Sequence, residues 1–250
     1  MNFLKRIREE YWYWRKISNF NMTHTDLIIQ KIRQNRISTT EVADCMNKTG
    51  LLDARLYPLN PRHFKVGRVR WTYALNESNW EHHRQVADIE PGLVIITEPF
   101  NCGERAIFGD LVTKYLMLYR QSEALIVLGK LRDIPRLIKE NYPIWLQGIS
   151  PIGCFNTKNE TDLDEAIIAQ RQALYDDSIA VCDDSGVIII PKELHTEEFL
   201  KKLDWIEEQE DIWFDCIDRR KWSTYDTVCL KKYLDEPDSN KFNPERNPLV

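Results

Sequence analysis

The sequence has no apolar run long enough to span a lipid bilayer, and this absence argues against a helical membrane protein. No signal peptide is expected, because Glu9 and Glu10 interrupt the basic N-terminal residues and no apolar core follows. The six cysteines form no CxxC pair and no metal-finger spacing, which indicates reduced and mostly buried thiols. The net charge of -5 disfavours a nucleic-acid-binding surface over the whole molecule. We therefore expect a cytoplasmic globular protein that has no transmembrane segment and binds no nucleic acid.

The sequence does contain enough apolar residues for one large domain with an extension at each end. Of the 250 residues, 43% are hydrophobic, which suffices for a substantial core. Residues 1–24 combine basic and aromatic side chains, a pattern that favours packing on the domain or on a neighbouring subunit over the alternative of an anionic membrane surface. Residues 25–217 form the predicted domain. Residues 218–250 form a C-terminal extension whose Pro- and Asn-rich end is expected to be loosely ordered.

The chain is organised around residues 91–150, which are predicted to form strand, helix, strand, helix and strand in turn. Leu93–Thr97 and Leu125–Leu128 are short apolar runs that are typical of buried strands. Between them, apolar residues such as Val112 and Leu116 recur at the spacing of one helix face. A strand, a crossover helix and a second strand imply a right-handed parallel unit. Ligands are therefore expected beyond the carboxyl ends of these strands.

Local patterns also predict the remaining elements. These are a helix over 25–34, a capping-box helix from Thr39 to about Lys48, a half-buried strand over 68–75, a polar surface loop over 156–165, a hairpin over 178–190 and a long acidic helix over 193–217. His82 and His83 are adjacent in sequence and would point in different directions from a helix, so no two-histidine metal site is predicted there.

Two polar clusters fall near the expected ligand-binding edge of the sheet. Gly109 and Asp110 stand near the start of the first helix, and Arg132 and Asp133 follow the second strand. The two carboxylates can hold a hard divalent cation, and the guanidinium can bind a substrate carboxylate or an enolate oxygen. Such groups together stabilise an oxygen that gains negative charge during a reaction. The residues alone leave a simpler interpretation open, in which Asp133 caps a helix beside a surface arginine.

Five motifs that include these residues follow one another along the chain. They are PG-x-V-I-I, A-x-x-G-D-L, G-x-x-R-D, P-I-W-x-x-G-x-S-P and D-D-S-G-V-I-I-I-P. In this order they resemble the RraA-like family, which groups regulators of ribonuclease E activity with class II 4-hydroxy-4-methyl-2-oxoglutarate aldolases. The resemblance covers about residues 26–217. It implies an α/β fold with a swivelling β/β/α core, parallel strands and crossover helices, assembled as a homotrimer or hexamer with active sites at subunit interfaces.

The resemblance also implies a role for each residue of the site. In the aldolase branch, Asp133 would ligate Mg²⁺ or Mn²⁺, Arg132 would bind the pyruvyl part of the substrate, and Asp110 would hold a metal-bound water. The backbone that faces the 2-oxo acid would belong to Gly109, Leu111 and Val112. The regulator branch commonly lacks both acids, whereas this chain keeps them.

The chain departs from the family pattern at several points. The segment from Leu111 to Leu131 is one residue longer than usual, which an insertion near Gln121 could absorb, and the Gly-rich stretch before the last hairpin is not recognisable. Aldolases of this family also receive a glutamate from the C-terminal region of the neighbouring subunit. The candidates here are Glu207, Glu208 and Glu210.

The leading functional prediction is a divalent-metal-dependent lyase that cleaves a C–C bond of a 2-oxo acid and leaves a pyruvate enolate. Aldol cleavage of 4-hydroxy-4-methyl-2-oxoglutarate and decarboxylation of oxaloacetate share this enolate, so one site can perform both reactions. The alternative from another class is a non-catalytic, RraA-like interaction or regulatory protein that binds another macromolecule. A third interpretation is the same enolate chemistry on an unusual keto acid, such as one derived from a sugar.

Overall fold

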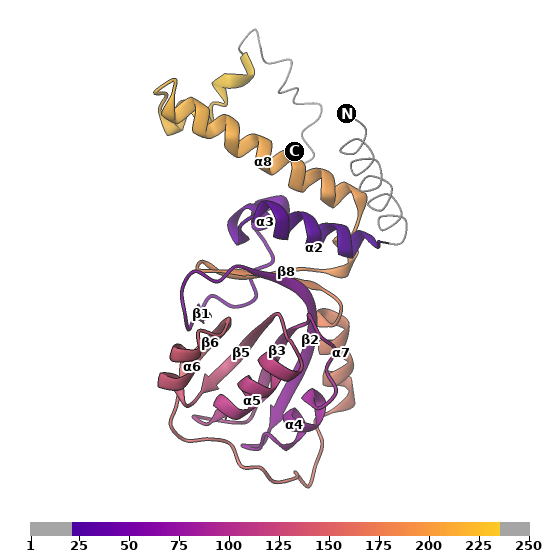
Figure 1. Cartoon of the computed structure of the whole chain (residues 1–250). Coiled ribbons are helices and arrows are strands. Elements are labelled where there is room, and N and C mark those ends of the chain that lie inside the picture. The colour runs from indigo at the N-terminus through magenta and orange to yellow at the C-terminus, as the bar shows by residue number, and fades with distance from the viewer. Residues whose placement is uncertain (1–21, 236–250) are drawn as a thin grey trace, which may run out of the picture.

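The computed structural model describes residues 22–235, which fold around one eight-stranded mixed sheet (Figure 1). The strands are β1 (Tyr57–Pro58), β2 (Lys65–Leu75), β3 (Val94–Phe100), β4 (Ala106–Phe108), β5 (Ala124–Leu131), β6 (Ile144–Ile149), β7 (Ile179–Asp183) and β8 (Gly186–Ile190). Their order is β1-β6-β5-β3-β2-β7-β8, and β4 pairs with β5 beside this path. The predictions for the aromatic N-terminal segment and for the tail after Asp235 lie outside the described residues.

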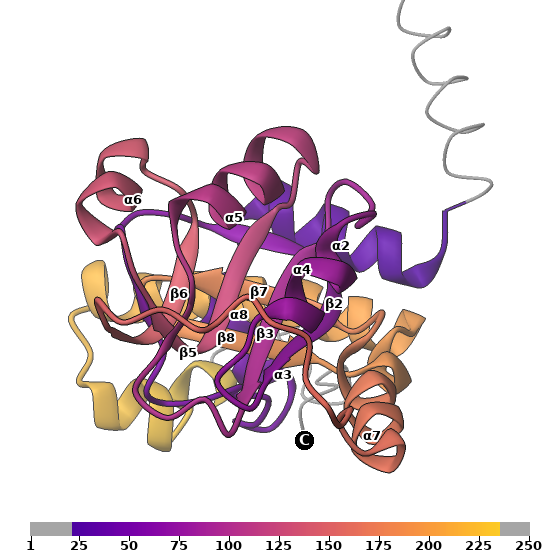
Figure 2. The same ribbon diagram turned by 90° about the horizontal axis from the view of Figure 1, so that it is seen from below.

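The centre of the sheet is parallel, as the sequence predicted. β2, β3, β5 and β6 run in one direction, and Val94 of β3 lies between Val69 of β2 and Ala124 of β5. The helices between these strands are α4 (Trp80–Val86), α5 (Asp110–Lys114) with the π-helical turn η1 (Tyr115–Tyr119), and α6 (Ile134–Glu140). Figure 2 shows α5 and α6 together on one side of the sheet and α7 (Glu165–Tyr175) on the other.

Each face of the parallel strands buries its own apolar cluster, because side chains alternate along a strand. Ile95, Leu125 and Val127 belong to the cluster under α5 and α6, which includes Leu116 and Leu137. Neighbouring positions on the same strands point the other way, into a cluster against which α7 packs. The short apolar runs of the sequence therefore become strands buried on both faces.

β2 joins this parallel centre to the antiparallel hairpin of β7 and β8. Residues 65–68 pair with β7, and residues 69–75 pair with β3. The prediction of a half-buried strand is wrong for residues 71–75, which are buried throughout. The polar Thr72 is accommodated there because its hydroxyl hydrogen-bonds Thr97 of β3 at 3.0 Å.

A third apolar cluster packs three helices on the β7–β8 hairpin. These helices are α2 (His24–Asn35), α3 (Thr39–Cys45) and α8 (Glu197–Asp218). Ile28, Phe199 and Leu203 contribute buried side chains from the helices to this cluster. The predicted hairpin and long acidic helix are thus confirmed. Helix α3 ends at Cys45, earlier than predicted, because the chain turns at Asn47 and Lys48, which have φ of 56° and 60°.

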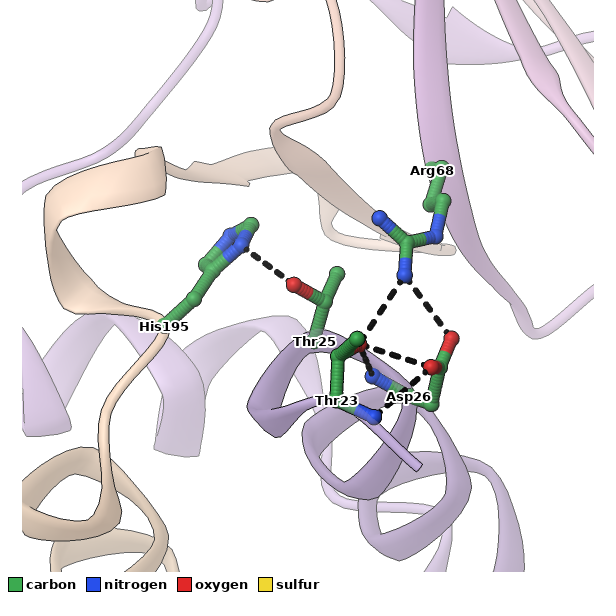
Figure 3. Close-up of polar contacts among 5 residues, drawn as sticks. All are labelled: Thr23, Thr25, Asp26, Arg68 and His195. Atoms are coloured by element: carbon green, nitrogen blue, oxygen red, sulfur yellow. Dashed lines mark hydrogen bonds and ion pairs between the residues drawn. The ribbon is translucent and has the colours of Figure 1, made fainter. Parts of the chain in front are cut away.

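Polar contacts fix the N-terminus of α2 to the sheet (Figure 3). Thr23 and Asp26 form a capping box, and Arg68 of β2 donates to Thr23 Oγ1 at 3.1 Å and to Asp26 Oδ1 at 2.8 Å. The Thr25 hydroxyl lies 2.9 Å from Nδ1 of His195, just before α8. These contacts join β2, α2 and the segment that leads into α8.

Some elements were not predicted. Residues 156–164 form the expected loop, but α7 follows it, with Asp164 capping its first turn through a 2.7 Å hydrogen bond to the Ala166 amide. The three-residue strand β4 was also missed. The remaining short turns are η2 (Lys192–Leu194), η3 (Tyr225–Cys229) and η4 (Lys232–Asp235). None of the helices within residues 22–235 has the length and apolar character needed to cross a bilayer.

Candidate active site

The two polar clusters predicted from the sequence meet at one edge of the sheet. β4 ends at Phe108 and β5 ends at Leu131, and these residues are partners in a parallel pair. The chain beyond β4 enters α5, while the chain beyond β5 enters α6. The Arg132 amide donates to the Phe108 carbonyl at 3.2 Å, which holds the two turns side by side.

The residues that carry the predicted chemistry meet across these turns. The Asp110 amide donates to Asp133 Oδ2 at 3.2 Å, and Arg132 Nε lies 3.8 Å from the same oxygen. The Asp110 side chain is only 16% exposed, whereas those of Arg132 and Asp133 are 45% and 41% exposed. The site therefore presents one sheltered carboxylate beside a more accessible carboxylate and guanidinium.

Two glycines leave the space that these side chains occupy. A Cβ atom on Gly109 would lie 2.0 Å from Asp133 Oδ2, and a Cβ atom on Gly153 would lie 2.3 Å from Arg132 Nη1. Any side chain at either position would displace a functional group. Asp133 itself has φ of 61°, a left-handed conformation that Asp tolerates better than most residues and that turns the chain from β5 into α6.

Arg136 is a component of the site that the sequence analysis missed. It lies in the first turn of α6, and its Nη1 donates to Asp110 Oδ2 in an ion pair. This hydrogen bond is the main reason why the pKa of the Asp110 carboxyl lies below its usual value of 3.8. Arg136 lies three residues after Asp133, and residues three apart share one side of a helical turn. This spacing was the sequence signal that could have placed Arg136 in the site.

The donor set suits a hard divalent cation that keeps several water ligands. Mg²⁺ is commonly bound through one or two carboxylates together with water and substrate oxygens, and Asp110 and Asp133 supply two carboxylates from adjacent turns. Within residues 22–235, no cluster of three or more His, Cys, Asp and Glu side chains could hold a metal ion. A cation at this site would therefore complete its coordination with other oxygen ligands, such as water, a backbone carbonyl, substrate or a group of a second subunit.

The predicted substrate-facing backbone lies in the first turn of α5. The Leu111 amide hydrogen-bonds the Asp110 carboxylate, which helps Arg136 to lower the pKa of that carboxyl. The Leu111 side chain is 77% exposed, whereas Val112 is buried. Both residues line an apolar hollow of about 290 Å³ between α4 and α5, together with His83 and Tyr115.

The candidate glutamates lie on α8, which in Figure 1 is separated from α5 and α6 by the α2–α3 layer and the hairpin. Glu207 pairs with Lys31 at 2.9 Å and accepts a 3.1 Å hydrogen bond from Asn35. Burial raises the pKa of Glu210, and nearby Glu41 raises it further. Glu207, Glu208 and Glu210 do not join the site of their own chain. Their contribution to a neighbouring subunit stays a prediction.

Comparison with known sequences gives a family assignment for most of the chain. Residues 39–189 match the RraA-like family model, which is described as Aldolase/RraA. A protein from Halalkalibacterium halodurans named "Putative 4-hydroxy-4-methyl-2-oxoglutarate aldolase" is 26% identical over 156 residues, which cover 62% of this chain and 73% of that protein. The resemblance predicted from the five motifs is thereby confirmed.

Solved structures share the fold at low sequence identity. An uncharacterized protein from Pseudomonas syringae pv. tomato superposes with a TM-score of 0.62 and 20% identity, over 82% of this chain and 93% of that one. The structure of Streptomyces coelicolor RraAS2, described as an unusual member of the RNase ES inhibitor RraA protein family, gives a TM-score of 0.55 and 17% identity, over 73% of this chain and 91% of that one. At these identities the likeness establishes the fold, and the predicted α/β class is confirmed.

Proposed function

This chain belongs to the RraA-like family, and we propose that it is a divalent-metal-dependent lyase that cleaves a C–C bond of a 2-oxo acid. The observation that carries the proposal is the contact of Asp110, Arg132 and Asp133 across two turns at the carboxyl edge of parallel strands. The aldolase activity in the name of the Halalkalibacterium relative supports the same reaction class. The reaction is of the 4-hydroxy-4-methyl-2-oxoglutarate aldolase or oxaloacetate decarboxylase type.

Each group of the site has a defined task in this reaction. The Arg132 guanidinium, which is partly exposed and not held in the close ion pair that Arg136 makes with Asp110, binds the substrate carboxylate through its planar fork. Asp133 would hold Mg²⁺ or Mn²⁺ directly, and Asp110 would hold the same ion through a water molecule. When bound, the cation supplies Lewis-acid stabilisation of the negative charge that develops on the 2-oxo oxygen. Asp110, with its low pKa, is ionised at neutral pH and accepts a proton through water during C–C cleavage.

The proposal includes assembly as a homotrimer or hexamer. Within residues 22–235 the carboxylates are too few for a closed metal site, and a glutamate of α8 from a neighbouring chain, Glu207 or Glu210, would add an acid to the pocket. The exposed side chains of Leu111, Ile149 and Ile152 surround the site with apolar surface that a neighbour can cover.

The direct test is pyruvate release from oxaloacetate and from 4-hydroxy-4-methyl-2-oxoglutarate in the presence of Mg²⁺ or Mn²⁺. Metal-only blanks and an EDTA control run beside the wild type. We expect Asp133→Ala to abolish metal-dependent turnover and Arg132→Ala to lower kcat/KM by about 10²- to 10³-fold, as the loss of an oxyanion-binding donor does. Lys139→Ala on the exposed side of α6 and Asp88→Ala are matched controls that should keep full activity.

The second candidate function is a non-catalytic interaction protein. The ion pair between Asp110 and Arg136 favours it, because this pair neutralises one of the two acids without a metal ion. Isothermal titration with Mn²⁺ separates the two functions. If the wild type binds no metal and releases no more pyruvate than the blank from either 2-oxo acid substrate, the interaction protein is favoured. If it binds metal but turns over neither substrate, the metal site stays assigned and only these two substrates are rejected.

A further inference from the structure

Two cysteines outside the proposed metal site face each other between neighbouring loops. Cys102 follows β3 and Cys154 follows β6, and both belong to the apolar cluster under α5 and α6. Their residues are 4% and 9% exposed. Both thiols are free, the Cys102 thiol donates to the Phe100 carbonyl at 3.5 Å, and the Cys154 side chain is close enough to be the main influence on the pKa of Cys102. The sequence predicted buried, unpaired thiols, but their separation by more than fifty positions concealed this pair.

Backbone hydrogen bonds hold the two loops in a fixed register. The Ala106 amide donates to the Ile152 carbonyl at 2.7 Å, and the Cys154 amide donates to the Ala106 carbonyl at 2.9 Å. The Arg105 amide donates to the Cys102 carbonyl at 3.1 Å, which ties the first cysteine to the same segment. These main-chain hydrogen bonds therefore hold the loops that carry Cys102 and Cys154 side by side.

The surroundings of Cys102 differ from those of the inert cysteines. Cys102 lines a hollow of about 390 Å³ together with Arg55, Arg105 and Lys130, so this residue borders a space that a small polar molecule can enter. The hydrogen bond from Cys154 lowers the pKa of the Cys102 thiol and raises that of Cys154. By contrast, complete burial raises the pKa of the Cys182 thiol well above its usual range.

We propose that Cys102 and Cys154 are a redox-active dithiol that hydrogen peroxide converts to a disulfide. The Cys102 thiolate attacks one peroxide oxygen, the O–O bond breaks, and the products are a sulfenic acid on Cys102 and hydroxide. The Cys154 sulfur then displaces the hydroxyl group of the sulfenic acid, which leaves as water with the Cys154 proton. The two thiols lose two electrons, and the peroxide gains them.

The disulfide would act on the loop that borders Arg132. Gly153, the neighbour of Cys154, touches the Arg132 guanidinium, and its carbonyl accepts a 3.0 Å hydrogen bond from Arg105 Nη1. A covalent link at Cys154 therefore fixes the wall against which the substrate-binding arginine of the proposed site rests. The dithiol itself depends on no part of the proposed lyase function.

The test uses the reduced full-length protein, hydrogen peroxide, blocking of the remaining thiols with N-ethylmaleimide under denaturing conditions, and peptide mass spectrometry. We expect a cross-linked peptide pair that contains Cys102 and Cys154, that is two hydrogen atoms lighter than the separate peptides, and that dithiothreitol reverses. The exposed Cys229 is the internal comparison, and Cys229→Ser should leave the cross-link intact.

Two variants assign the roles of the sulfur atoms and guard against effects of misfolding. In Cys154→Ser, the sulfenic acid on Cys102 should persist and be trapped by dimedone. In Cys102→Ser, Cys154 should stay unmodified, and circular dichroism should show a native fold for both. The proposal is overturned if both thiols of the wild type remain fully alkylated at a peroxide concentration that oxidises Cys229, or if Cys102 links to a different cysteine.

Discussion

At the scale of single residues, Arg136 restrains the acid that the proposed reaction needs. Its guanidinium forms an ion pair with Asp110 Oδ2. A metal cation that approaches this carboxylate must displace the guanidinium, at least in part. The Asp110 side chain is sheltered, but that of Arg136 is 69% exposed, so water competes for the guanidinium and the pair is of modest strength.

The variant Arg136→Ala should therefore bind Mn²⁺ more tightly, with a Kd lower by a factor on the order of a few. The pKa of Asp110 rises in this variant but returns only toward its usual 3.8, so the carboxylate stays ionised at neutral pH. Titration calorimetry of the wild type and the variant measures the difference, and Lys139→Ala on the same helix is the control. Unchanged or weaker binding would show that Arg136 does not compete with the cation.

His82 is a buried titratable residue without a role in the proposed chemistry. Its ring stacks on Phe108 at a centroid distance of 4.9 Å, and neither ring nitrogen has a hydrogen-bond partner. Desolvation lowers the pKa of His82 to about 3, with a smaller effect from His83. The folded protein therefore keeps this imidazole neutral at a pH where the unfolded chain protonates it.

This shift predicts a loss of stability in mild acid. Because the folded pKa is below the unfolded value of 6.5, the unfolded state gains the proton first, and stability falls as the pH drops below 6.5. Between pH 7 and pH 5 the contribution of His82 amounts to about 2 kcal/mol. His82→Leu should remove this share of the pH dependence, as measured by urea unfolding at both pH values. If the wild type and the variant lose the same free energy of unfolding between pH 7 and pH 5, the acid sensitivity belongs to other groups.

The site could be predicted in part because its chemistry resides in short, ordered motifs. Asp110, Arg132 and Asp133 follow or precede apolar runs whose identity as neighbouring strands fixes their meeting point. Arg136 escaped prediction because its role depends on the direction of a side chain across two turns. The pairing of Cys102 with Cys154 likewise depends on how β3 and β6 are placed around β5, which no local pattern records.

At the scale of elements, the start of α2 is fixed by a compact set of hydrogen bonds. Asp26 completes the capping box and accepts from Arg68 of β2 (Figure 3). Burial alone would raise the pKa of Asp26, but hydrogen bonds from Thr23 and Arg68 outweigh it and lower the pKa below 3.8.

Asp26→Ala should lower the free energy of unfolding by about 1 to 2 kcal/mol at pH 7, because it removes a cap. Asp44→Ala, which breaks only the 2.6 Å surface pair between Asp44 of α3 and Lys48 beyond the end of that helix, should cost less than about 0.5 kcal/mol. Since a lowered carboxyl pKa stabilises the fold above the unfolded value and the effect is lost below it, the difference between Asp26→Ala and wild type should shrink as the pH falls through 3.8. Equal effects of the two variants in chemical denaturation would contradict the capping role.

Elements with a strong local signal were predicted, and elements that depend on their neighbours were not. The capping boxes at Thr23 and Ser38 and the acidic turn of the hairpin mark their own boundaries. Helix α7 has no buried residue and a weak apolar face, so no signal in the sequence marked a helix after the polar loop. The π-helical turn η1 is a further element that was not predicted. A π-helical turn takes up one residue more than an α-helical turn. It therefore offers a place for the one-residue insertion, relative to the family pattern, that the sequence analysis placed near Gln121.

At the scale of the whole molecule, an interface site can be tested by complementation. Asp133→Ala removes the metal-binding half of a site, and Glu207→Ala or Glu210→Ala removes the half that a neighbour would supply. If two inactive variants are refolded together in equal amounts, about a quarter of the sites in a ring receive both intact halves. We expect pyruvate release to recover to about that fraction for the glutamate that contributes. Recovery with neither glutamate variant, at an oligomeric state confirmed by sedimentation, would reject the shared site.

The short strand β4 gives the two halves of the site unequal resistance to local opening. Asp133 follows β5, which has partners on both sides, whereas Asp110 follows three residues attached to β5 and, through Ala106, to the 152–154 loop. The free energy of local unfolding should therefore be lower for the arm that carries Asp110. Any ligand that bridges Asp110 and Asp133 must therefore supply binding free energy that offsets the lower stability of the arm carrying Asp110. Ligand binding and closure of this arm are consequently one thermodynamic event, and the bound ligand stabilises the weakest part of the fold.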